Sequence, residues 1–348
     1  MNILSLYFAL LFDRKGKRVF LQRQKLRFFI MISRRLLRIK ALMVLYAYNR
    51  REDDDLARAE TELLFSIGKT YDLYHYLLLL ILEIADISSE KIDMGLQKNI
   101  PSIEDLNPNR RFVENAVVKQ LRNNHDLQKY LTENKLSWAN YSDIPRTLYT
   151  RMLTWEPFFE YMKSDEKSYS SDKKIIIRLV IELFAHSEDL LANFEEQSIY
   201  WNDDMEYVAA MVEKTLKKFK AGANEKNSLL PLFKNEEDRD YVKILFRRTI
   251  LRIKESSEII NRNTTNWEVE RIALMDILVM QLAITEIIEF PEIPVKVTLN
   301  EYIEISKYYC TSKSSTFVNG ILDKVVREMR DNGMFKKAGR GLVGDSVN

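Results

Sequence analysis

Residues 298–307 read Thr-Leu-Asn-Glu-Tyr-Ile-Glu-Ile-Ser-Lys, and residues 317–322 read Phe-Val-Asn-Gly-Ile-Leu. Thr298 and the glutamate three residues later have the spacing of a capping box, which predicts the start of a helix. A second helix is predicted after residues 314–316, because their hydroxyl groups can cap its first turn. A glycine inside a helix costs about 1 kcal/mol relative to alanine, so Gly320 indicates the close approach of a neighbouring helix. This part of the chain therefore predicts a pair of packed helices.

The composition predicts an all-α fold for the whole chain. Its 348 residues are 46% hydrophobic, which is enough for one or two sizeable cores, and only nine are glycine and seven proline. With so few helix breakers and little period-two alternation, most segments favour long amphipathic helices. We expect helices near residues 33–50, 56–86, 109–122, 125–134, 173–190, 204–219 and 237–261, with Ser33 capping the first and a second capping box at Thr265 and Glu268.

Bulk charge and cysteine content exclude several classes of protein. The net charge is only +2, so any nucleic-acid partner must be recognised by a local patch. The single cysteine, Cys310, excludes an intramolecular disulfide and is most simply a packed thiol, which fits a cytoplasmic protein.

The apolar runs at residues 3–12 and 76–82 are too short to cross a bilayer, so we predict no membrane insertion. The basic residues at 14–18 follow the first run, which is the wrong order for a secretory signal.

Catalytic signatures are absent from the sequence. It has no glycine-rich phosphate loop and no Cys/His cluster, and its three histidines, His75, His125 and His186, are isolated. The adjacent carboxylates, such as Glu195 and Glu196, are typical of a solvated helix face. We therefore predict a protein that is not an enzyme and that has no cofactor or metal.

Two motifs with consistent spacing carry a resemblance to a known family. Pro294 to Glu301 reads Pro-Val-Lys-Val-Thr-Leu-Asn-Glu and is followed by Phe-Val-Asn-Gly at 317–320. An arginine-rich segment, 34–46, ends in Val-Leu-Tyr. In this order, these segments resemble the NusB transcription antitermination family. Further residues that agree with the resemblance are Trp267, Arg271, Ala283 and Glu286.

The resemblance implies two three-helix subdomains, interrupted here by a large expansion. Residues 31–51 correspond to the first helix of the family and residues 235–330 to its C-terminal helical domain. Between them, 52–234 is an expansion whose aromatic density indicates a packed helical module. Residues 331–348 are predicted to be a flexible tail. Residues 1–30 are an upstream extension, a misplaced start or a basic tail, and the sequence leaves these open.

The first helix carries the strongest signal for an anion. Arg34, Arg35, Arg38 and Lys40 place positive charge in its first two turns, where the helix dipole is unfavourable for cations and a phosphate would relieve it. Tyr46 lies two turns beyond Arg38 and could stack on a base. The alternative is a solvated basic face with Tyr46 in the core. The resemblance favours RNA, since it implies that the arginine-rich helix of the family contacts RNA.

The loop between the two motifs is the second candidate for RNA binding. Lys313, Ser315, Thr316 and Phe317 combine a cation, hydroxyl groups, the start of a helix and an aromatic ring. The family commonly has an acidic residue near Lys313 and an arginine at the position of Gln281, so both positions depart from its pattern. The resemblance further implies that Glu270 and Asp276 face a protein partner, although a solvated helix face explains them equally well.

The resemblance implies a function in transcription. Such proteins pair with NusE, a small-subunit ribosomal protein, and the pair binds the single-stranded boxA element of nascent ribosomal RNA within an RNA polymerase antitermination complex. The alternative is a non-enzymatic scaffold that keeps the fold and has lost RNA binding. NusB-like domains also occur fused to RNA cytosine methyltransferases, but the nucleotide-binding α/β domain and catalytic cysteine of those enzymes are missing from this sequence.

Overall fold

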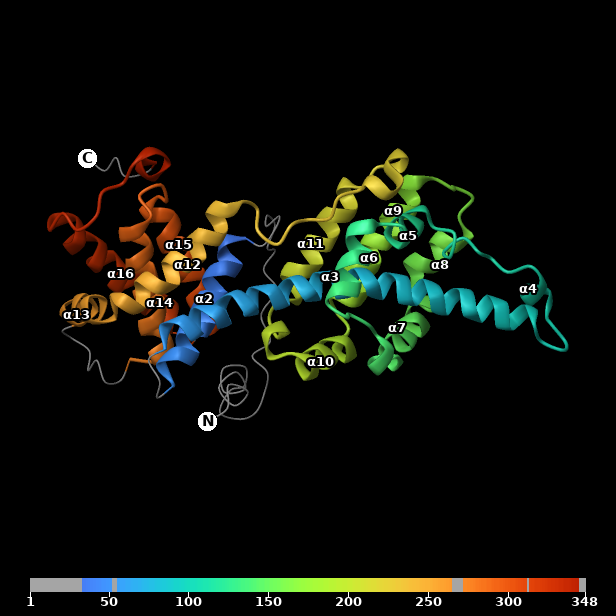
Figure 1. Cartoon of the computed structure of the whole chain (residues 1–348), viewed down its shortest axis with the longest axis horizontal. Helices are drawn as coiled ribbons and strands as arrows, with labels where there is room; N and C mark the ends of the chain where they lie inside the picture. Colours follow the sequence, from blue (N-terminus) through green and yellow to red (C-terminus); the bar gives the residue numbers. More distant parts are fainter. Residues whose placement is uncertain (1–32, 52–54, 265–271, 312, 344–348) are drawn as a thin grey trace. The chain divides into compact units, whose positions relative to one another are not determined.

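The computed structural model of the chain describes residues 33–51, 55–264, 272–311 and 313–343 (Figure 1). Within these ranges every regular element is a helix and none is a β-strand, which confirms the all-α prediction. The described residues form two compact units. Unit 1 comprises 33–67 and 233–343, and unit 2 comprises 68–232. The start of one long helix belongs to unit 1 and the remainder of that helix to unit 2.

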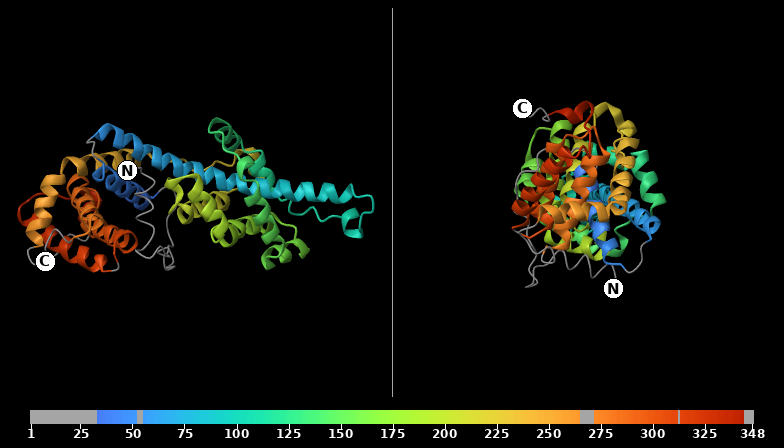
Figure 2. Two further views of the ribbon diagram at one scale, coloured as in Figure 1. Left: turned by 90° about the horizontal axis from the view of Figure 1, so that it is seen from below. Right: turned by 90° about the vertical axis from the view of Figure 1, so that its left-hand side faces the viewer.

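Unit 1 is built around α14, an almost entirely buried helix (Figures 1 and 2). Such a helix is apolar on all sides because neighbours cover every face. The helices that pack on it are α2, α12, α13, α15 and α16. The helices of unit 1 are α2 (Arg34–Asn49), the start of α3 (Leu56–Leu96), α12 (Glu236–Leu251), α13 (Ile253–Asn263), α14 (Leu274–Glu289), α15 (Val295–Tyr309), α16 (Ser314–Asp331) and the 3₁₀ turn η6 (Gly339–Leu342).

Two predicted helix starts have different outcomes. Ser33 caps α2 as expected, with its hydroxyl accepting from the Leu36 N–H at 3.3 Å. The prediction of a capping box at Thr298 is wrong, because α15 begins at Val295, directly after Pro294. Thr298 lies inside the helix and is fully buried. The predicted box at 265–268 lies outside the described residues.

The segment predicted as one helix over 237–261 is two helices. Arg252 separates α12 from α13 with a non-helical backbone, φ −102° and ψ 11°. Its guanidinium lies 2.7 Å from Glu289 and 2.7 Å from Glu255. The hydroxyl of Ser256 also donates to the Arg252 carbonyl at 2.8 Å, a local side-chain bond of the kind that competes with regular helix continuation.

Unit 2 is helical and contains a cluster of packed aromatic side chains. Trp138 is buried and stacks on Tyr76 at 4.1 Å. The two ends of the unit meet, because the Tyr71 hydroxyl donates to the Leu230 carbonyl at 2.8 Å. Its helices are the rest of α3, α4 (Ile103–Leu106), α5 (Ala116–Arg122), α6 (His125–Glu133), α7 (Asp143–Leu153), α8 (Glu156–Lys163), α9 (Tyr169–Arg178), the π-helix η2 (Leu179–Phe184), α10 (Glu188–Gln197), α11 (Met205–Lys218) and the 3₁₀ turns η1 (Ala139–Tyr141), η3 (Ile199–Trp201) and η4 (Ala221–Lys226).

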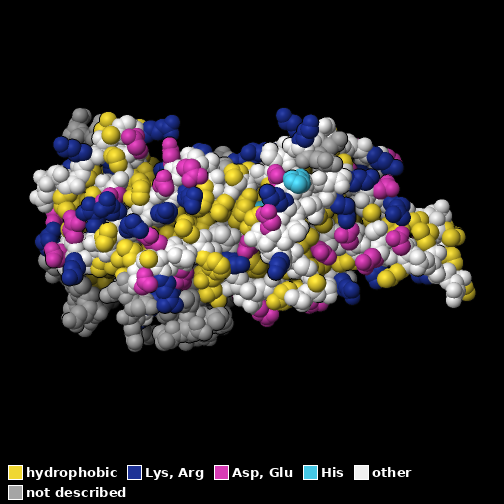
Figure 3. Space-filling model, in the orientation of Figure 1, with side chains coloured by type: hydrophobic (Ala, Val, Ile, Leu, Met, Phe, Trp, Pro, Cys, Tyr) yellow, Lys and Arg dark blue, Asp and Glu magenta, His cyan; other side chains and the backbone are white. Residues whose placement is uncertain are grey.

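The end of α3 and the short helix α4 form an exposed apolar tip (Figure 3). Ile100 is 90% exposed and Ile103 is 79% exposed. The tip is nevertheless held by polar contacts, since Ser102 and Asp105 form a capping box and Lys98 lies 2.9 Å from Asp105. Its apolar side chains are therefore held in place while facing solvent.

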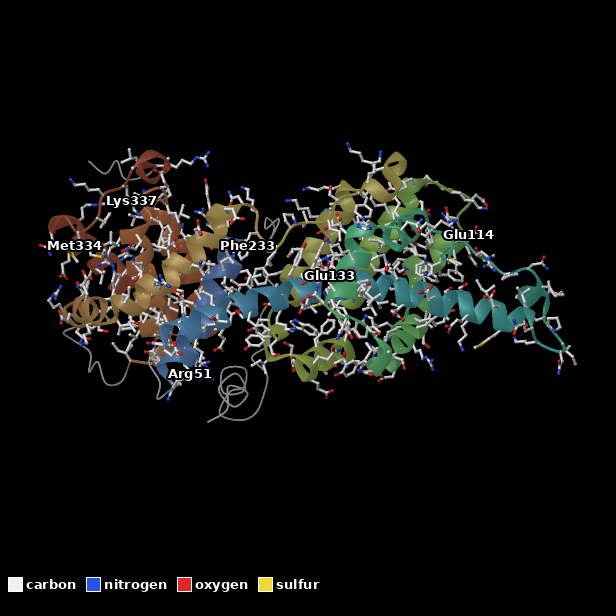
Figure 4. All side chains as sticks on the ribbon, in the orientation of Figure 1. Arg51, Glu114, Glu133, Phe233, Met334 and Lys337 are labelled. Atoms are coloured by element: carbon white, nitrogen blue, oxygen red, sulfur yellow. The ribbon has the colours of Figure 1, made fainter. Side chains whose placement is uncertain are left out.

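Residues 333–343, assigned to a flexible tail from the sequence, make specific contacts at the C-terminal end of α14. Lys337 donates to the carbonyls of Ile287 and Phe290 at 2.9 and 3.0 Å, and the Ala338 N–H donates to the Pro291 carbonyl at 3.1 Å. Figure 4 labels Lys337 beside the core of unit 1. Since α14 ends at Glu289, these donors satisfy backbone carbonyls at and beyond a helix C-terminus.

Candidate functional site

A buried ion pair lies at the centre of unit 1. The Nε and Nη2 atoms of Arg38 each lie 2.7 Å from a Glu286 carboxylate oxygen, and the two residues are 3% and 0% exposed. The same carboxylate accepts from the hydroxyls of Tyr241, Thr298 and Tyr302 at 2.6, 2.8 and 3.2 Å. Glu286 thereby joins α14 to α2, α12 and α15.

The surroundings of this cluster determine its ionisation. Burial alone raises the pKa of Glu286, but the Arg38 charge and the hydrogen bonds outweigh burial and hold that pKa below its ordinary value. Burial and the Glu286 charge raise the pKa of Tyr241 and of Tyr302, so both phenols stay protonated and donate. The cluster is an ionised carboxylate with all its partners supplied from within unit 1.

This geometry places Arg38 inside the fold, although the sequence pattern assigned it, with Arg34, to an anion or to RNA. The Arg38 guanidinium pairs with Glu286 inside unit 1, so its role is structural. Arg35 forms a bidentate pair with Glu301 at 2.7 and 2.8 Å and is also mostly buried. Arg34 is the most accessible of the three, with a side chain that is 37% exposed, and it pairs with Asp238 at 2.8 Å.

Tyr46 occupies the core position that was the alternative to base stacking. It is 9% exposed, within an α2 whose residues Leu36 to Tyr48 are all buried. The guanidinium of Arg50 lies 5.5 Å from the centre of its ring. A base would need an open ring face, so the expected stacking role of Tyr46 does not fit this structure.

The start of α16 presents the predicted loop residues at the surface. Lys313 and Thr316 are exposed, and Ser315 and Phe317 are half-buried. Lys313 is the N-cap residue, and no described side chain caps this helix. An uncapped helix start offers backbone N–H groups and the positive end of the helix dipole to an anion. These four residues therefore form one accessible, positively polarised surface, which we call the α16 start.

Asp276 lies behind the α16 start instead of on a partner-facing surface. It is 6% exposed, and it accepts from the buried hydroxyl of Ser314 at 2.8 Å. Burial and contact with Asp276 raise the pKa of the Cys310 thiol, which is consistent with a packed, unreactive cysteine. Asp276 is therefore used within the fold, its contact with a partner stays a prediction, and Glu270 lies outside the described residues.

Two further positions differ from expectation. Gln281 is 3% exposed and donates to the Ser257 hydroxyl at 3.0 Å, so the position is internal. Gly320 lies on the exposed side of α16, and a Cβ built there meets nothing within 4 Å. The predicted close packing of a neighbouring helix on Gly320 is wrong.

Comparisons with known proteins identify the family. Residues 204–327 match the family model described as NusB family. The transcription antitermination protein NusB of Salinibacter ruber is 43% identical over 115 residues, which span 33% of this chain and 72% of the relative. The chain belongs to the NusB family. It is longer than the relative, and the matched range begins at α11, earlier than the segment recognised from sequence motifs.

Other NusB proteins match over similar lengths. The protein of Chloroherpeton thalassium is 41% identical over 105 residues, which cover 30% of this chain and 50% of the relative. The protein of Natranaerobius thermophilus is 34% identical over 95 residues, or 27% and 68% of the two chains. No solved structure gives a significant match. Family membership supports a role in transcription antitermination for this chain.

The described ranges lack the features of two other kinds of site. In them, no helix is long and apolar enough to cross a membrane. Within the same ranges, no group of three or more His, Cys, Asp or Glu side chains is placed to hold a metal ion.

Proposed function

We propose that this NusB protein is a non-enzymatic cytoplasmic RNA-binding factor that pairs with NusE on boxA-like single-stranded RNA. In this role it joins the antitermination complex of RNA polymerase on nascent ribosomal transcripts. The observation that carries the proposal is the α16 start, where Lys313 and an uncapped helix N-terminus face solvent in the part of the chain that matches the family.

The distribution of charge supports assigning RNA to unit 1. Residues 68–232 contain 21 Lys and Arg against 26 Asp and Glu, a net charge of −5. Unit 1, taken as residues 33–67 and 233–343, contains 25 Lys and Arg against 23 Asp and Glu, a net charge of +2. Phosphate contacts by Lys and Arg supply most of the salt-dependent affinity for nucleic acid, so an acidic unit 2 is a poor RNA surface.

Within unit 1, the structure changes which residues we assign to RNA. Lys313 and the backbone N–H groups of Ser315 and Thr316 would contact phosphate, the hydroxyls of the same two residues would help fix its position, and the half-buried ring of Phe317 would support a base. The N–H of Ser314 already donates to the Thr311 carbonyl at 2.9 Å. Arg34 remains a secondary candidate because its side chain is 37% exposed. Arg35, Arg38 and Tyr46 are excluded from this assignment by their internal contacts and burial.

An RNA titration by fluorescence anisotropy tests the assignment. Lys313→Ala should weaken binding of boxA RNA. It should also make the slope of log affinity against log salt shallower, by about the amount that one phosphate contact contributes. Lys167→Ala, at an exposed lysine of unit 2, removes the same charge and should leave both quantities unchanged. If Lys313→Ala and Lys167→Ala behave alike, the α16 start is not the RNA surface. If the unmutated protein fails to bind boxA RNA even with NusE, the scaffold alternative replaces the proposal.

A further inference from the structure

Unit 2 contains an open pocket that the family resemblance does not explain. Its volume is about 350 Å³, at the lower end of the range for small-ligand sites. Its walls come from Tyr71 and His75 of α3, from Asp126, Tyr130 and Glu133 of α6, and from the segment 229–231. Figure 4 labels Glu133 at the end of α6. We call this site the His75 pocket.

The pocket is held in shape by hydrogen bonds within unit 2. The Tyr71 hydroxyl donates to the Leu230 carbonyl at 2.8 Å, which fixes the segment 229–231 against α3. The Tyr130 hydroxyl donates to Asp72 at 2.7 Å. The His75 ring stacks on Tyr130 with ring centres 3.7 Å apart and meets Tyr71 edge-on at 4.4 Å. The aromatic walls are therefore in place before any ligand arrives.

His75 contributes a hydrogen-bond acceptor to the pocket wall. The residue is 1% exposed, and its Nδ1 lies 2.9 Å from the Tyr71 carbonyl oxygen. A carbonyl can only accept, so Nδ1 carries the proton and Nε2 is left with a lone pair. Burial lowers the pKa of His75 to about 4, so the ring is neutral at physiological pH. No described residue donates to Nε2.

The charged side chains at the mouth of the His75 pocket favour a positively charged ligand. Asp126 and Glu133 are seven residues apart and therefore share a face of α6. Lys129 lies between them, 4.0 Å from Glu133, but both side chains of that pair are about 60% exposed and the interaction is weak. The whole of unit 2 is acidic. Together, these features present acceptors and negative charge beside aromatic and apolar walls.

We propose that the His75 pocket binds an alkylguanidinium or alkylammonium group. One N–H of the cation is donated to His75 Nε2, its charge lies near Asp126 and Glu133, and its alkyl stem packs against Leu230 and the tyrosine rings. The cation is either a small free molecule or the arginine or lysine side chain of a protein. The proposal is independent of the RNA function assigned to unit 1.

NMR of the full chain labelled with ¹⁵N-histidine tests the proposal directly. The ligand probes are blocked arginine (N-acetylarginine N-methylamide), the corresponding blocked citrulline, which has a similar shape without the charge, and butylguanidinium. We expect a saturable shift of the His75 Nε2 signal with the arginine probe, and affinity for citrulline at least about tenfold weaker. His186, an exposed histidine, serves as the internal control and should not shift.

Matched variants locate the site. The double change Asp126→Asn and Glu133→Gln should weaken binding of the cation about tenfold or more, whereas Asp165→Asn, at another exposed carboxylate of unit 2, should not. His75→Phe keeps an aromatic ring and should abolish binding. If that variant does not fold, the surface variants decide the question, because their side chains are exposed.

The outcomes are distinct. Tighter binding of the blocked arginine than of butylguanidinium supports a protein side chain as the natural ligand, and the reverse order supports a small free cation. The proposal is overturned if citrulline binds as tightly as arginine, or if the cations shift His75 no more than an equal concentration of NaCl does. Equal binding by the double variant and wild type also overturns it.

Discussion

The Arg38 guanidinium and the Glu286 carboxylate form a buried bidentate pair between residues 248 positions apart in the chain. This pair joins the first described helix of unit 1 to its central helix. It also fixes the orientation of Glu286 toward hydroxyls from α12 and α15. An arginine that resembled a surface contact in the sequence is therefore the centre of the core.

Arg38→Met should destabilise unit 1 by about 3–5 kcal/mol, because it leaves Glu286 buried without its counter-ion. Arg34→Met is the matched control on the same helix. Its partially exposed pair with Asp238 should contribute no more than about 1 kcal/mol. Urea unfolding followed by circular dichroism measures both. Equal, small losses of stability from the two variants would contradict the structural role of Arg38.

The stability of unit 1 should decrease in acid partly through Glu286. Its pKa in the folded protein lies below the value of about 4.3 for an unfolded chain. The resulting stabilisation is complete above that value and is lost as the pH falls through the folded pKa. Glu286→Gln removes this titration. Melting temperatures measured from pH 7 to pH 2 should therefore show the gap between wild type and variant narrowing below about pH 4.3. A gap that is constant with pH would argue against an ionised Glu286.

Gly320→Ala should stabilise the protein by about 1 kcal/mol, because the new methyl group enters open space on an exposed helix face. Gly341→Ala should do the opposite. A Cβ at Gly341 would lie 1.9 Å from the Pro291 carbonyl oxygen, so residues 338–343 would have to move. Thermal melts of the two variants distinguish these cases. A loss of stability in Gly320→Ala would show that a neighbour does cover this position.

Unit 2 should be dispensable for binding NusE. The hydrogen bond between Tyr71 and Leu230 brings the two ends of this unit together, so a short Gly/Ser linker can replace residues 72–229. Glu60 and Glu62 would still anchor the start of α3 to Arg247 and Arg51. We expect retained helical circular dichroism, a cooperative melt and binding of NusE. A shortened protein that folds but does not bind NusE would place that interface in unit 2.

The sequence predicted the helical class and the cap of α2 because these depend on local patterns. Its prediction that hydroxyls of residues 314–316 cap the next helix was wrong, because α16 already begins at Ser314 and its N-cap, Lys313, makes no side-chain cap. It did not predict the roles of Arg38 and Thr298, since their common partner, Glu286, is brought to them only by the packing of distant helices. The capping-box pattern at Thr298 was overridden by Pro294, which starts α15 one turn earlier. His75 appeared isolated for the same reason, because Tyr130 and Leu230 approach it only in the folded chain.

The most direct test of the central claim is a titration of the full-length protein with boxA RNA and with a scrambled RNA of the same length. Each titration is made with and without NusE at two salt concentrations. The account predicts that boxA RNA binds more tightly than the scrambled RNA, that NusE strengthens the binding, and that higher salt weakens it. Equal affinity for both RNAs under all conditions, or no binding of either, would contradict it.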